Sequence, residues 1–299
     1  MNPVHDALES VRLPPLMART SGRPEVVIGL LDGPVAVGHP DLASESIREL
    51  PGVAGRCTQV SSRICQHGTF IAGILTARRG SGAPALCPGS SLLVRPIFGE
   101  TMEAAERLPS ASPRQVAEAI GESVDSGAWV LNLSAASAVP STRVEQQLRD
   151  ALDYAASRDV IVVAAAGNQA TLGSSAITRH PWVLPVVGFG SDGRPQVQSN
   201  LGGSIGRRGL GAPGEDIASL AATGGLARQT GTSVAAAFVT GAIALLWSEF
   251  PDATALEIKA AVTHGQGGQR RTSVAPPLLD AWAAHEVLSR TLARRGVTA

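Results

Sequence analysis

The sequence lacks the charge excess and the long apolar segments that mark proteins that bind nucleic acids or membranes. Its 299 residues include 25 basic and 25 acidic side chains, so the formal net charge is zero. Balanced charge argues against nucleic acid or an anionic membrane surface as a partner. We also expect no segment of the length of a membrane span. A globular protein is the class that remains, and the apolar content of 44% fits it.

The first 19 residues lack the apolar core of a signal peptide. They hold Asp6, Glu9, Arg12 and three prolines instead. From this we expect a cytoplasmic location.

Cysteine is scarce, and its positions carry little information. Cys57, Cys65 and Cys87 form no metal-ligand spacing, and three cysteines cannot all pair with one another. A disulfide between Cys57 and Cys65 is compatible with the spacing, but we expect reduced thiols in a cytoplasmic protein. We expect neither a metal nor a cofactor.

Apolar runs of strand length alternate with segments of helix length along most of the chain. We predict strands at 26–31, 92–98, 129–132, 160–165 and 182–187. We predict helices at 70–77, 114–126, 143–157, 233–247, 254–263 and 278–292. Continuous apolar strands that alternate with helices are typical of a doubly wound parallel sheet. The predicted fold is therefore α/β, a three-layer, mostly parallel sheet with helices on both faces.

Two segments differ from this core in composition. Residues 1–24 hold Pro14 and Pro15 and are predicted to form an N-terminal arm on the surface, so that residues 25–299 make a single domain. Residues 99–113 are polar, and this composition predicts an exposed segment that leaves the core of the domain. Its acidic side chains, Glu100, Glu103 and Glu106, fit either a solvated face or a substrate contact.

Ser233 lies at or near the start of a strongly apolar predicted helix. Residues 231–237 read Gly-Thr-Ser-Val-Ala-Ala-Ala and lead into the run from Phe238 to Trp247. Unpaired backbone N–H groups and the positive end of the helix dipole stabilise negative charge near a first helical turn. Ser233 is therefore a candidate nucleophile. The alternative is that Ser233 or Thr232 only caps the helix.

Further polar residues are predicted to meet Ser233 at one edge of the sheet. Asp32, Ser134 and Asn168 follow predicted strands, whereas His67 opens a predicted helix. In a doubly wound sheet such positions meet along the edge where ligands bind. The alternative for Asp32 is that it only caps a turn, and the alternative for His67 is that its role is only structural.

The chemistry of these residues fits together as a catalytic group. A serine hydroxyl is a poor nucleophile until a base takes its proton, and His67 is suited to do so near neutral pH. Asp32 can orient and stabilise the imidazolium. The amide of Asn168 can bind the oxyanion that forms when Ser233 attacks a carbonyl.

Several motifs then resemble one family. They are 27–33 (Val-Ile-Gly-Leu-Leu-Asp-Gly) followed by 39–42 (His-Pro-Asp-Leu), His67-Gly68-Thr69 followed by 71–73 (Ile-Ala-Gly), 163–168, 211–214 (Gly-Ala-Pro-Gly), and 231–235 (Gly-Thr-Ser-Val-Ala). In this order they are similar to the motifs of the subtilases, the serine peptidases of the subtilisin family. The resemblance covers roughly residues 25–263 and implies the subtilisin-like fold and peptide-bond hydrolysis. It implies Asp32, His67 and Ser233 as the triad and Asn168 in the oxyanion hole.

The resemblance also implies where the substrate binds. Ser134, Ala135, Ala136, Ala166 and Gly167 would line the pocket for the substrate residue before the scissile bond. Their small side chains would let a peptide lie close, as an added strand does. The alternative for Ala135 and Ala136 is that small residues only allow tight strand packing.

The chain departs from the family pattern at three places. Ala237-Phe238 stands where the serine motif usually continues into proline, which removes no catalytic atom. Asp41 matches a residue that often binds calcium, but residues 79–89 offer few further oxygen ligands, so we predict no calcium site. Only about 25 residues precede the first strand, so we expect folding without the usual inhibitory propeptide.

The string from Leu31 to Val35, followed by His39-Pro40, is similar to subtilases of cyanobactin-type clusters, which process ribosomally made precursor peptides. The leading hypothesis is therefore an endopeptidase that matures such a peptide. Macrocyclising members are disfavoured because no large insertion follows His67. Two alternatives stay open, a general intracellular protein-degrading subtilase and a pseudo-protease that binds peptide without cutting it.

Overall fold

The structure is a computed structural model of the chain. It describes residues 3–42, 46–52, 55–100, 111–134, 142–264 and 271–298.

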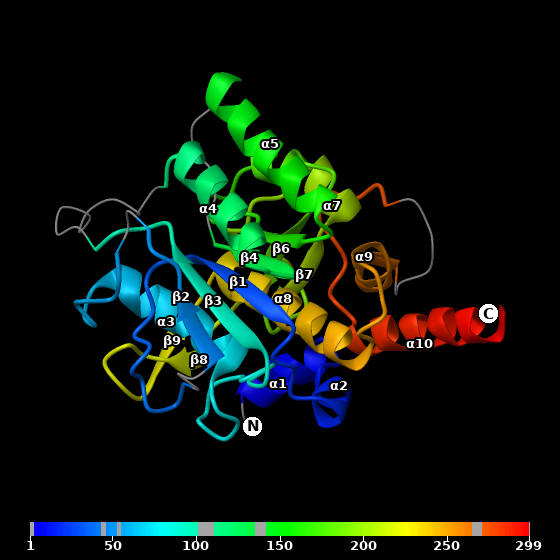
Figure 1. The fold of residues 1–299 in the computed structure, drawn as a ribbon, viewed down its shortest axis with the longest axis horizontal. Coiled ribbons are helices and arrows are strands. Elements are labelled where there is room, and N and C mark those ends of the chain that lie inside the picture. Colours follow the sequence, from blue (N-terminus) through cyan, green and yellow to red (C-terminus); the bar gives the residue numbers. More distant parts are fainter. Residues whose placement is uncertain are drawn as a thin grey trace.

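A seven-stranded parallel sheet forms the centre of the fold (Figure 1). Its strands are β1 (Val27–Asp32), β2 (Ile47–Glu49), β3 (Ser91–Pro96), β4 (Val130–Leu133), β5 (Ile161–Ala165), β6 (Val183–Phe189) and β7 (Leu210–Pro213). They are ordered β2-β3-β1-β4-β5-β6-β7, and every pairing between neighbours is parallel. The strand order reverses direction between β1 and β4, and in open α/β sheets ligands bind in the crevice at such a point.

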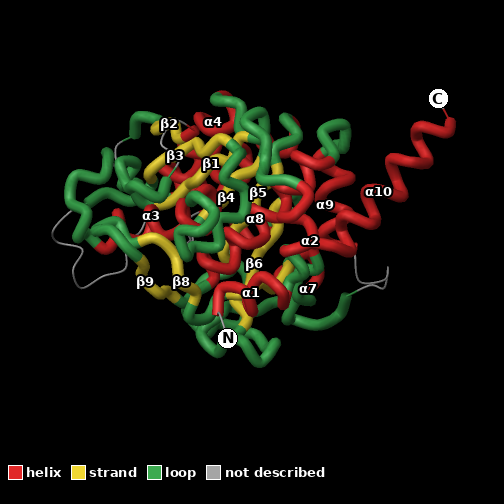
Figure 2. The backbone as a smooth tube through the Cα atoms, turned by 90° about the horizontal axis from the view of Figure 1, so that it is seen from below, coloured by secondary structure: helices red, strands yellow, loops and turns green. Residues whose placement is uncertain are grey.

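Helices cover both faces of this sheet. They are α1 (Pro3–Ser10), α2 (Pro14–Arg19), α3 (Arg63–Thr76), α4 (Pro113–Asp125), α5 (Thr142–Ser157), α6 (Ala176–Arg179), α7 (Gly203–Arg208), α8 (Thr232–Glu249), α9 (Ala255–His264) and α10 (Ala281–Thr298). Helices α4 and α5 pack side by side on one face, whereas α3 and α8 lie on the other (Figure 1). The C-terminal part of α10 extends away from the rest of the molecule (Figure 2).

The alternation of side chains along the strands separates the two layers of the core. In β1, Ile28 and Leu30 belong to the cluster packed around α3 and α8, whereas Leu31 belongs to the cluster packed around α4 and α5. Successive side chains of a strand point to opposite faces, so both faces of β1 are apolar. This explains the continuous apolar run from which the strand was predicted. The predicted three-layer α/β fold is confirmed.

Helix α8 contradicts one expectation. It has 18 residues and a mean hydropathy of 1.4, which is long and apolar enough to cross a membrane. However, 94% of it is buried inside the fold, and it packs against β4, β5, β6 and β7. The apolar surface of α8 is therefore part of the core, although the expectation that no segment has the length of a span was wrong.

The ends of the predicted elements shift in places, and four strands were not predicted. Helix α3 begins at Arg63, well before the predicted start at Phe70. Strands β2 and β7 and the antiparallel pair of β8 (Ile217–Leu220) and β9 (Leu226–Gln229) are short and were missed. The remaining predicted strands and helices are present with end shifts of a few residues.

The N-terminal residues contribute to the core. Val11, Leu13 and Leu16 have no exposed surface and belong to the same cluster as α8. The division of the chain at residue 24 stays a prediction.

Candidate active site

Asp32 is the last residue of β1, and its side chain is fully buried. Its Oδ1 accepts hydrogen bonds from the backbone N–H of Gly33, at 2.6 Å, and from Nδ1 of His67, at 2.7 Å. A buried carboxylate needs such partners because burial without them costs several kcal/mol. The hydrogen bond to Nδ1 leaves Nε2 of His67 as the proton acceptor toward the other side.

Two glycines let α3 approach β1 closely enough for this contact. A Cβ at Gly33 would lie 2.3 Å from the carbonyl oxygen of Ile64, and a Cβ at Gly68 would lie 2.5 Å from that of Gly33. Any side chain at either position would push the helix away from the strand. The glycines beside Asp32 and His67 therefore set the distance between these two residues.

The start of α3 is fixed by contacts that the sequence did not reveal. Ser62 caps the helix by accepting a hydrogen bond from the N–H of Cys65 at 3.2 Å. Glu100 accepts hydrogen bonds from Thr58 and Ser62 in the loop before the helix. Burial raises the pKa of Glu100, but these hydrogen bonds and one from Gln59 outweigh it, so that the pKa lies below its ordinary value. Glu100 thus stabilises the loop; Glu103 and Glu106 lie outside the described residues.

Ser233 is the second residue of α8 and is 8% exposed. Its hydroxyl oxygen lies 2.9 Å from Nε2 of His67. The alternative that Ser233 or Thr232 caps the helix is wrong, because the N-cap is Gly231 and no side chain caps it there. The Thr232 hydroxyl instead accepts a hydrogen bond from the N–H of Gly167 at 3.1 Å. Helix α8 is thereby joined to the loop that carries Asn168.

Asn168 follows β5 on a tight turn and is exposed. The turn needs Gly167, whose φ is +105°. Oδ1 of Asn168 accepts a hydrogen bond from the N–H of Thr232 at 3.0 Å. Among the described residues none accepts a hydrogen bond from Nδ2 of Asn168. The donor group therefore remains available to a ligand beside Ser233.

The electrostatics of the site favour a protonated His67. Burial lowers the pKa of His67, but the charge of Asp32 and the hydrogen bond to it raise it more, so the pKa lies above its ordinary value of 6.5. The carboxylate therefore increases the basicity of the imidazole toward the Ser233 hydroxyl.

The structure describes only some of the predicted substrate-binding residues. Ser134 directly follows β4, its N–H donates to the carbonyl of Leu31 at 3.1 Å, and its hydroxyl accepts from Nδ2 of the buried Asn132 at 3.3 Å. Ala166 and Gly167 follow β5 at the same edge of the sheet. Ala135 and Ala136 lie outside the described residues.

The loop at 79–89, which would complete a calcium site at Asp41, carries a cationic side chain. The guanidinium of Arg79 donates hydrogen bonds to the backbone carbonyls of Met17, Thr20 and Leu86. Calcium requires six or more oxygen ligands. In the loop at 79–89, the guanidinium of Arg79 is a positive charge and already binds the carbonyl of Leu86, so the described residues of this loop do not fit calcium.

Cys57 and Cys65 form a disulfide, with their Cα atoms 5.5 Å apart. The expectation of reduced thiols is wrong for this pair, because the loop before α3 brings the two residues into bonding range. Cys87 is a free, buried thiol, and burial raises its pKa to about 12. Disulfides are typical of oxidising compartments, so this pair does not fit the expected cytoplasmic location, which stays a prediction.

Breaking this disulfide is expected to lower the stability of the protein. Closing a loop of this length contributes about 2.5 kcal/mol by chain entropy. Loss of that amount is expected to lower Tm by about 5 °C. The check is thermal unfolding with and without a thiol reductant.

Its control is the double variant Cys57→Ala, Cys65→Ala, whose Tm should not respond to the reductant, because Cys87 is buried and unreactive. Equal Tm values for the wild type in both conditions would contradict the assignment.

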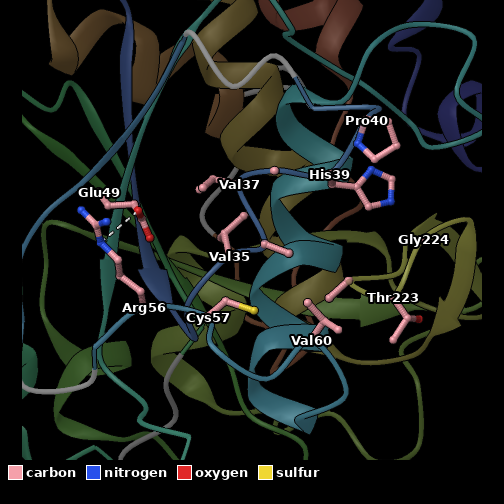
Figure 3. Close-up of a pocket in the computed structure, with 13 residues that line it drawn as sticks. Val35, Val37, His39, Pro40, Glu49, Arg56, Cys57, Val60, Thr223 and Gly224 are labelled. Carbon is pink, nitrogen blue, oxygen red and sulfur yellow. Dashed lines mark ion pairs between the residues drawn. The ribbon is translucent and has the colours of Figure 1, made fainter.

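A pocket with a volume of about 470 Å³ lies beside the start of α3 (Figure 3). It is lined by residues of four segments: 35–40 after β1, Glu49 of β2, Arg56, Cys57 and Val60 before α3, and 222–224 between β8 and β9. Glu49 and Arg56 form an ion pair of 3.3 Å at one side of the pocket (Figure 3).

The pocket is joined to the candidate active site through Gln66. The Gln66 side chain donates to the carbonyl of Val60 at 2.8 Å and accepts from the N–H of Ala222 at 3.1 Å. Gln66 precedes His67 on α3, so the walls of the pocket and the position of the imidazole are linked. Neither His67 nor Ser233 lines the pocket.

Comparison with known proteins identifies the family of the chain. The sequence model of the Subtilase family matches residues 23–276. Among solved structures, the protease domain of PatA is 27% identical with a TM-score of 0.81, and the alignment covers 90% of this chain and 97% of that one. The prenylagaramide maturation protease PagA is 26% identical with a TM-score of 0.79, covering 92% and 98%.

Curated relatives show the same relationship. Mycosin-3 of Mycobacterium tuberculosis is 30% identical, with 73% of this chain aligned, and the match spans 59% of that protein's length. Subtilisin of Bacillus pumilus is 24% identical over 84% of this chain and 87% of its own length. PatA and PagA support the predicted similarity to cyanobactin-type maturation subtilases. With the family model matching most of its length, the chain belongs to the Subtilase family of serine peptidases.

Proposed function

We propose that this subtilase is an endopeptidase that cuts a ribosomally made precursor peptide during its maturation. The observation that carries the proposal is the continuous hydrogen-bonded row from Asp32 through His67 to Ser233. Asn168 is held at the start of α8 through its Oδ1, and its Nδ2 has no acceptor among the residues that the structure describes. Nucleophile, base and orienting carboxylate in this arrangement are the requirements of acyl transfer.

In the first half of the proposed reaction Ser233 attacks the scissile carbonyl. His67 Nε2 accepts the hydroxyl proton as the bond forms, and Asp32 stabilises the resulting imidazolium. Nδ2 of Asn168 and the backbone N–H of Ser233, in the first turn of α8, donate hydrogen bonds to the oxyanion. His67 then passes its proton to the leaving amine, which leaves an acyl-enzyme on Ser233.

In the second half a water molecule attacks the acyl-enzyme. His67 accepts the proton of the water, the oxyanion forms again beside Asn168, and the Ser233 hydroxyl leaves with the proton of His67. The products are two peptides with new termini, and the enzyme returns to its starting state.

The proposed substrate class is supported by the similarity to PatA, whose name describes a patellamide maturation protease, and to PagA. A maturation protease is expected to cut a library of unstructured synthetic peptides at one sequence pattern and to degrade unfolded casein slowly. Mass spectrometry of the products measures both. Cleavage of casein at many positions and at a comparable rate would support general protein degradation instead, and binding without cleavage would support a pseudo-protease.

The pH profile of kcat/KM is expected to show an acid limb with a midpoint above pH 6.5. Protonated His67 cannot accept the Ser233 proton, so activity is lost as the pH falls through the pKa of His67. Because Asp32 raises this pKa above 6.5, the loss occurs at a higher pH than for an ordinary histidine. Initial rates with a fluorogenic peptide across the neutral range measure the midpoint. A midpoint at or below 6.5 would contradict the raised pKa of His67, and the absence of an acid limb would contradict its role as the base.

Replacement of Asn168 by alanine is expected to lower kcat by about 10²–10³ with little change in KM, a magnitude that comes from the matching asparagine of subtilisin itself. The oxyanion exists only in the transition state and the intermediates, so ground-state binding does not depend on its donor. Steady-state kinetics separates the two constants. A rise in KM with unchanged kcat would show that Asn168 only binds substrate.

A further inference from the structure

The loop that carries Asn168 needs contacts from other segments of the chain to keep its backbone conformation. Gly167 has a φ of +105°, and Ala170, which is not a glycine, has a φ of +53°. Conformations of this kind persist only where surrounding contacts stabilise them. Asn168 itself is exposed, so packing cannot fix its position.

Asn200 supplies contacts of this kind from the segment between β6 and α7. Its Nδ2 donates to the carbonyl of Ala166 at 3.1 Å and to Oε1 of Gln169 at 2.7 Å. Its Oδ1 accepts from the N–H groups of Gln169 at 3.0 Å and Thr171 at 3.1 Å. Its own N–H donates to the carbonyl of Gly167 at 2.8 Å.

These hydrogen bonds lie on both sides of Asn168 in the sequence. Two reach backbone carbonyls before it, and two come from backbone N–H groups after it. Only a side-chain amide offers two donors and an acceptor with two lone pairs within the same reach. Aspartate would lose the donors, and alanine would lose every side-chain contact.

We propose that Asn200 is a positioning residue that holds the loop at 166–171 so that Nδ2 of Asn168 is placed to meet the oxyanion. The inference rests on the proposed function and deepens it. Functional groups must be held within about 0.5 Å of their productive geometry by the contacts around them. Asn200 acts through Asn168 and needs no contact with substrate.

Loss of Asn200 is expected to change kcat and to leave KM nearly unchanged. A displaced Asn168 amide weakens stabilisation of the oxyanion, which lowers kcat, whereas substrate binding in the ground state is unaffected. Loss of Asn200 is therefore expected to lower kcat about 10- to 100-fold, as small displacements in other active sites do.

The test is a double-mutant cycle of Asn200→Ala and Asn168→Ala, measured as kcat and KM on one fluorogenic peptide. In the wild-type background Asn200→Ala should lower kcat about 10- to 100-fold with KM within about twofold. In the Asn168→Ala background the same change should alter kcat by less than about threefold, because the group through which it acts is absent.

Gln198→Ala is the matched control. Gln198 lies in the same segment and its side chain donates only to Gln196, whereas its backbone carbonyl accepts from the N–H of Ala170 and is kept in the variant. This variant should retain the wild-type kcat. Titration of active sites with a fluorophosphonate corrects every rate for the fraction of folded enzyme, so a partly unfolded variant does not imitate the effect.

Several results would overturn the inference. They are an equal fall in kcat in both backgrounds, a change confined to KM, or an unchanged kcat in Asn200→Ala while Asn168→Ala is impaired. If Asn168→Ala itself keeps the wild-type kcat, the proposed oxyanion site fails, and the inference fails with it. The two failures are therefore distinguishable within one set of variants.

Discussion

Replacement of Ser233 by alanine is expected to lower kcat by about 10⁶-fold, the magnitude known for the matching serine of subtilisin, a member of the same family. The variant keeps the fold because the hydroxyl has little packing role in the first turn of α8. What remains is the weak catalysis that substrate binding and the oxyanion donors provide without a nucleophile. Single-turnover hydrolysis of a fluorogenic peptide measures the loss.

Ser248 provides the control for this variant, because it is a buried serine on the same helix whose hydroxyl donates to the carbonyl of Ala244 at 2.7 Å. Ser248→Ala removes a hydroxyl from α8 without touching His67 and should keep the wild-type kcat. A kcat of Ser233→Ala within about tenfold of the wild type would show that another group is the nucleophile.

Replacement of Asp32 by asparagine is expected to lower kcat by about 10⁴-fold, a magnitude taken from the matching aspartate of another serine peptidase. The amide can present its N–H to Nδ1 of His67, which leaves Nε2 protonated and unable to accept the Ser233 proton. The change also removes the charge that raises the pKa of His67, so burial alone should place that pKa below 6.5. Steady-state kinetics and the pH profile measure the two effects.

Asp216→Asn is the matched change at an exposed aspartate, whose partner is Arg228 on the small β8–β9 sheet. It should leave both kcat and the acid limb unchanged. An Asp32→Asn variant with the wild-type kcat would contradict a role for the carboxylate in catalysis.

The main features of the site could be predicted because, in a parallel sheet, a residue that follows a strand lies at a known edge of the sheet. Asp32 and Asn168 directly follow the apolar runs of β1 and β5, and parallel strands place their carboxyl ends at one edge. Helix α8 then brings Ser233 to the same edge. A single sequence therefore sufficed to select four residues that the structure brings together.

The start of α3 could not be predicted in this way. It depends on Ser62, on hydrogen bonds to the distant Glu100, and on the disulfide between Cys57 and Cys65. The apolar pattern that identifies a helix shows its buried face, but the first turn of α3 is held by contacts from elsewhere in the chain. His67 was therefore assigned to a helix start, although it is the fifth residue of the helix.

Asn200 shows a second limit of sequence analysis. It lies in a polar segment after β6, where nothing in the local composition sets it apart from its neighbours. Its role is visible only from its hydrogen bonds to the loop around Asn168. Strand β9 was missed for a related reason, because it has no buried residue and thus no apolar periodicity, whereas its partner β8 is buried but only four residues long.

The central claim is that His67 and Asp32 activate Ser233 as the nucleophile, and mapping of a covalent adduct tests it most directly. The wild-type protein is treated with a fluorophosphonate and digested with trypsin, and the fragments are sequenced by mass spectrometry. One adduct is expected, located on Ser233, and almost none in His67→Ala. An adduct on another residue, or equal labelling of the His67→Ala variant, would contradict this claim.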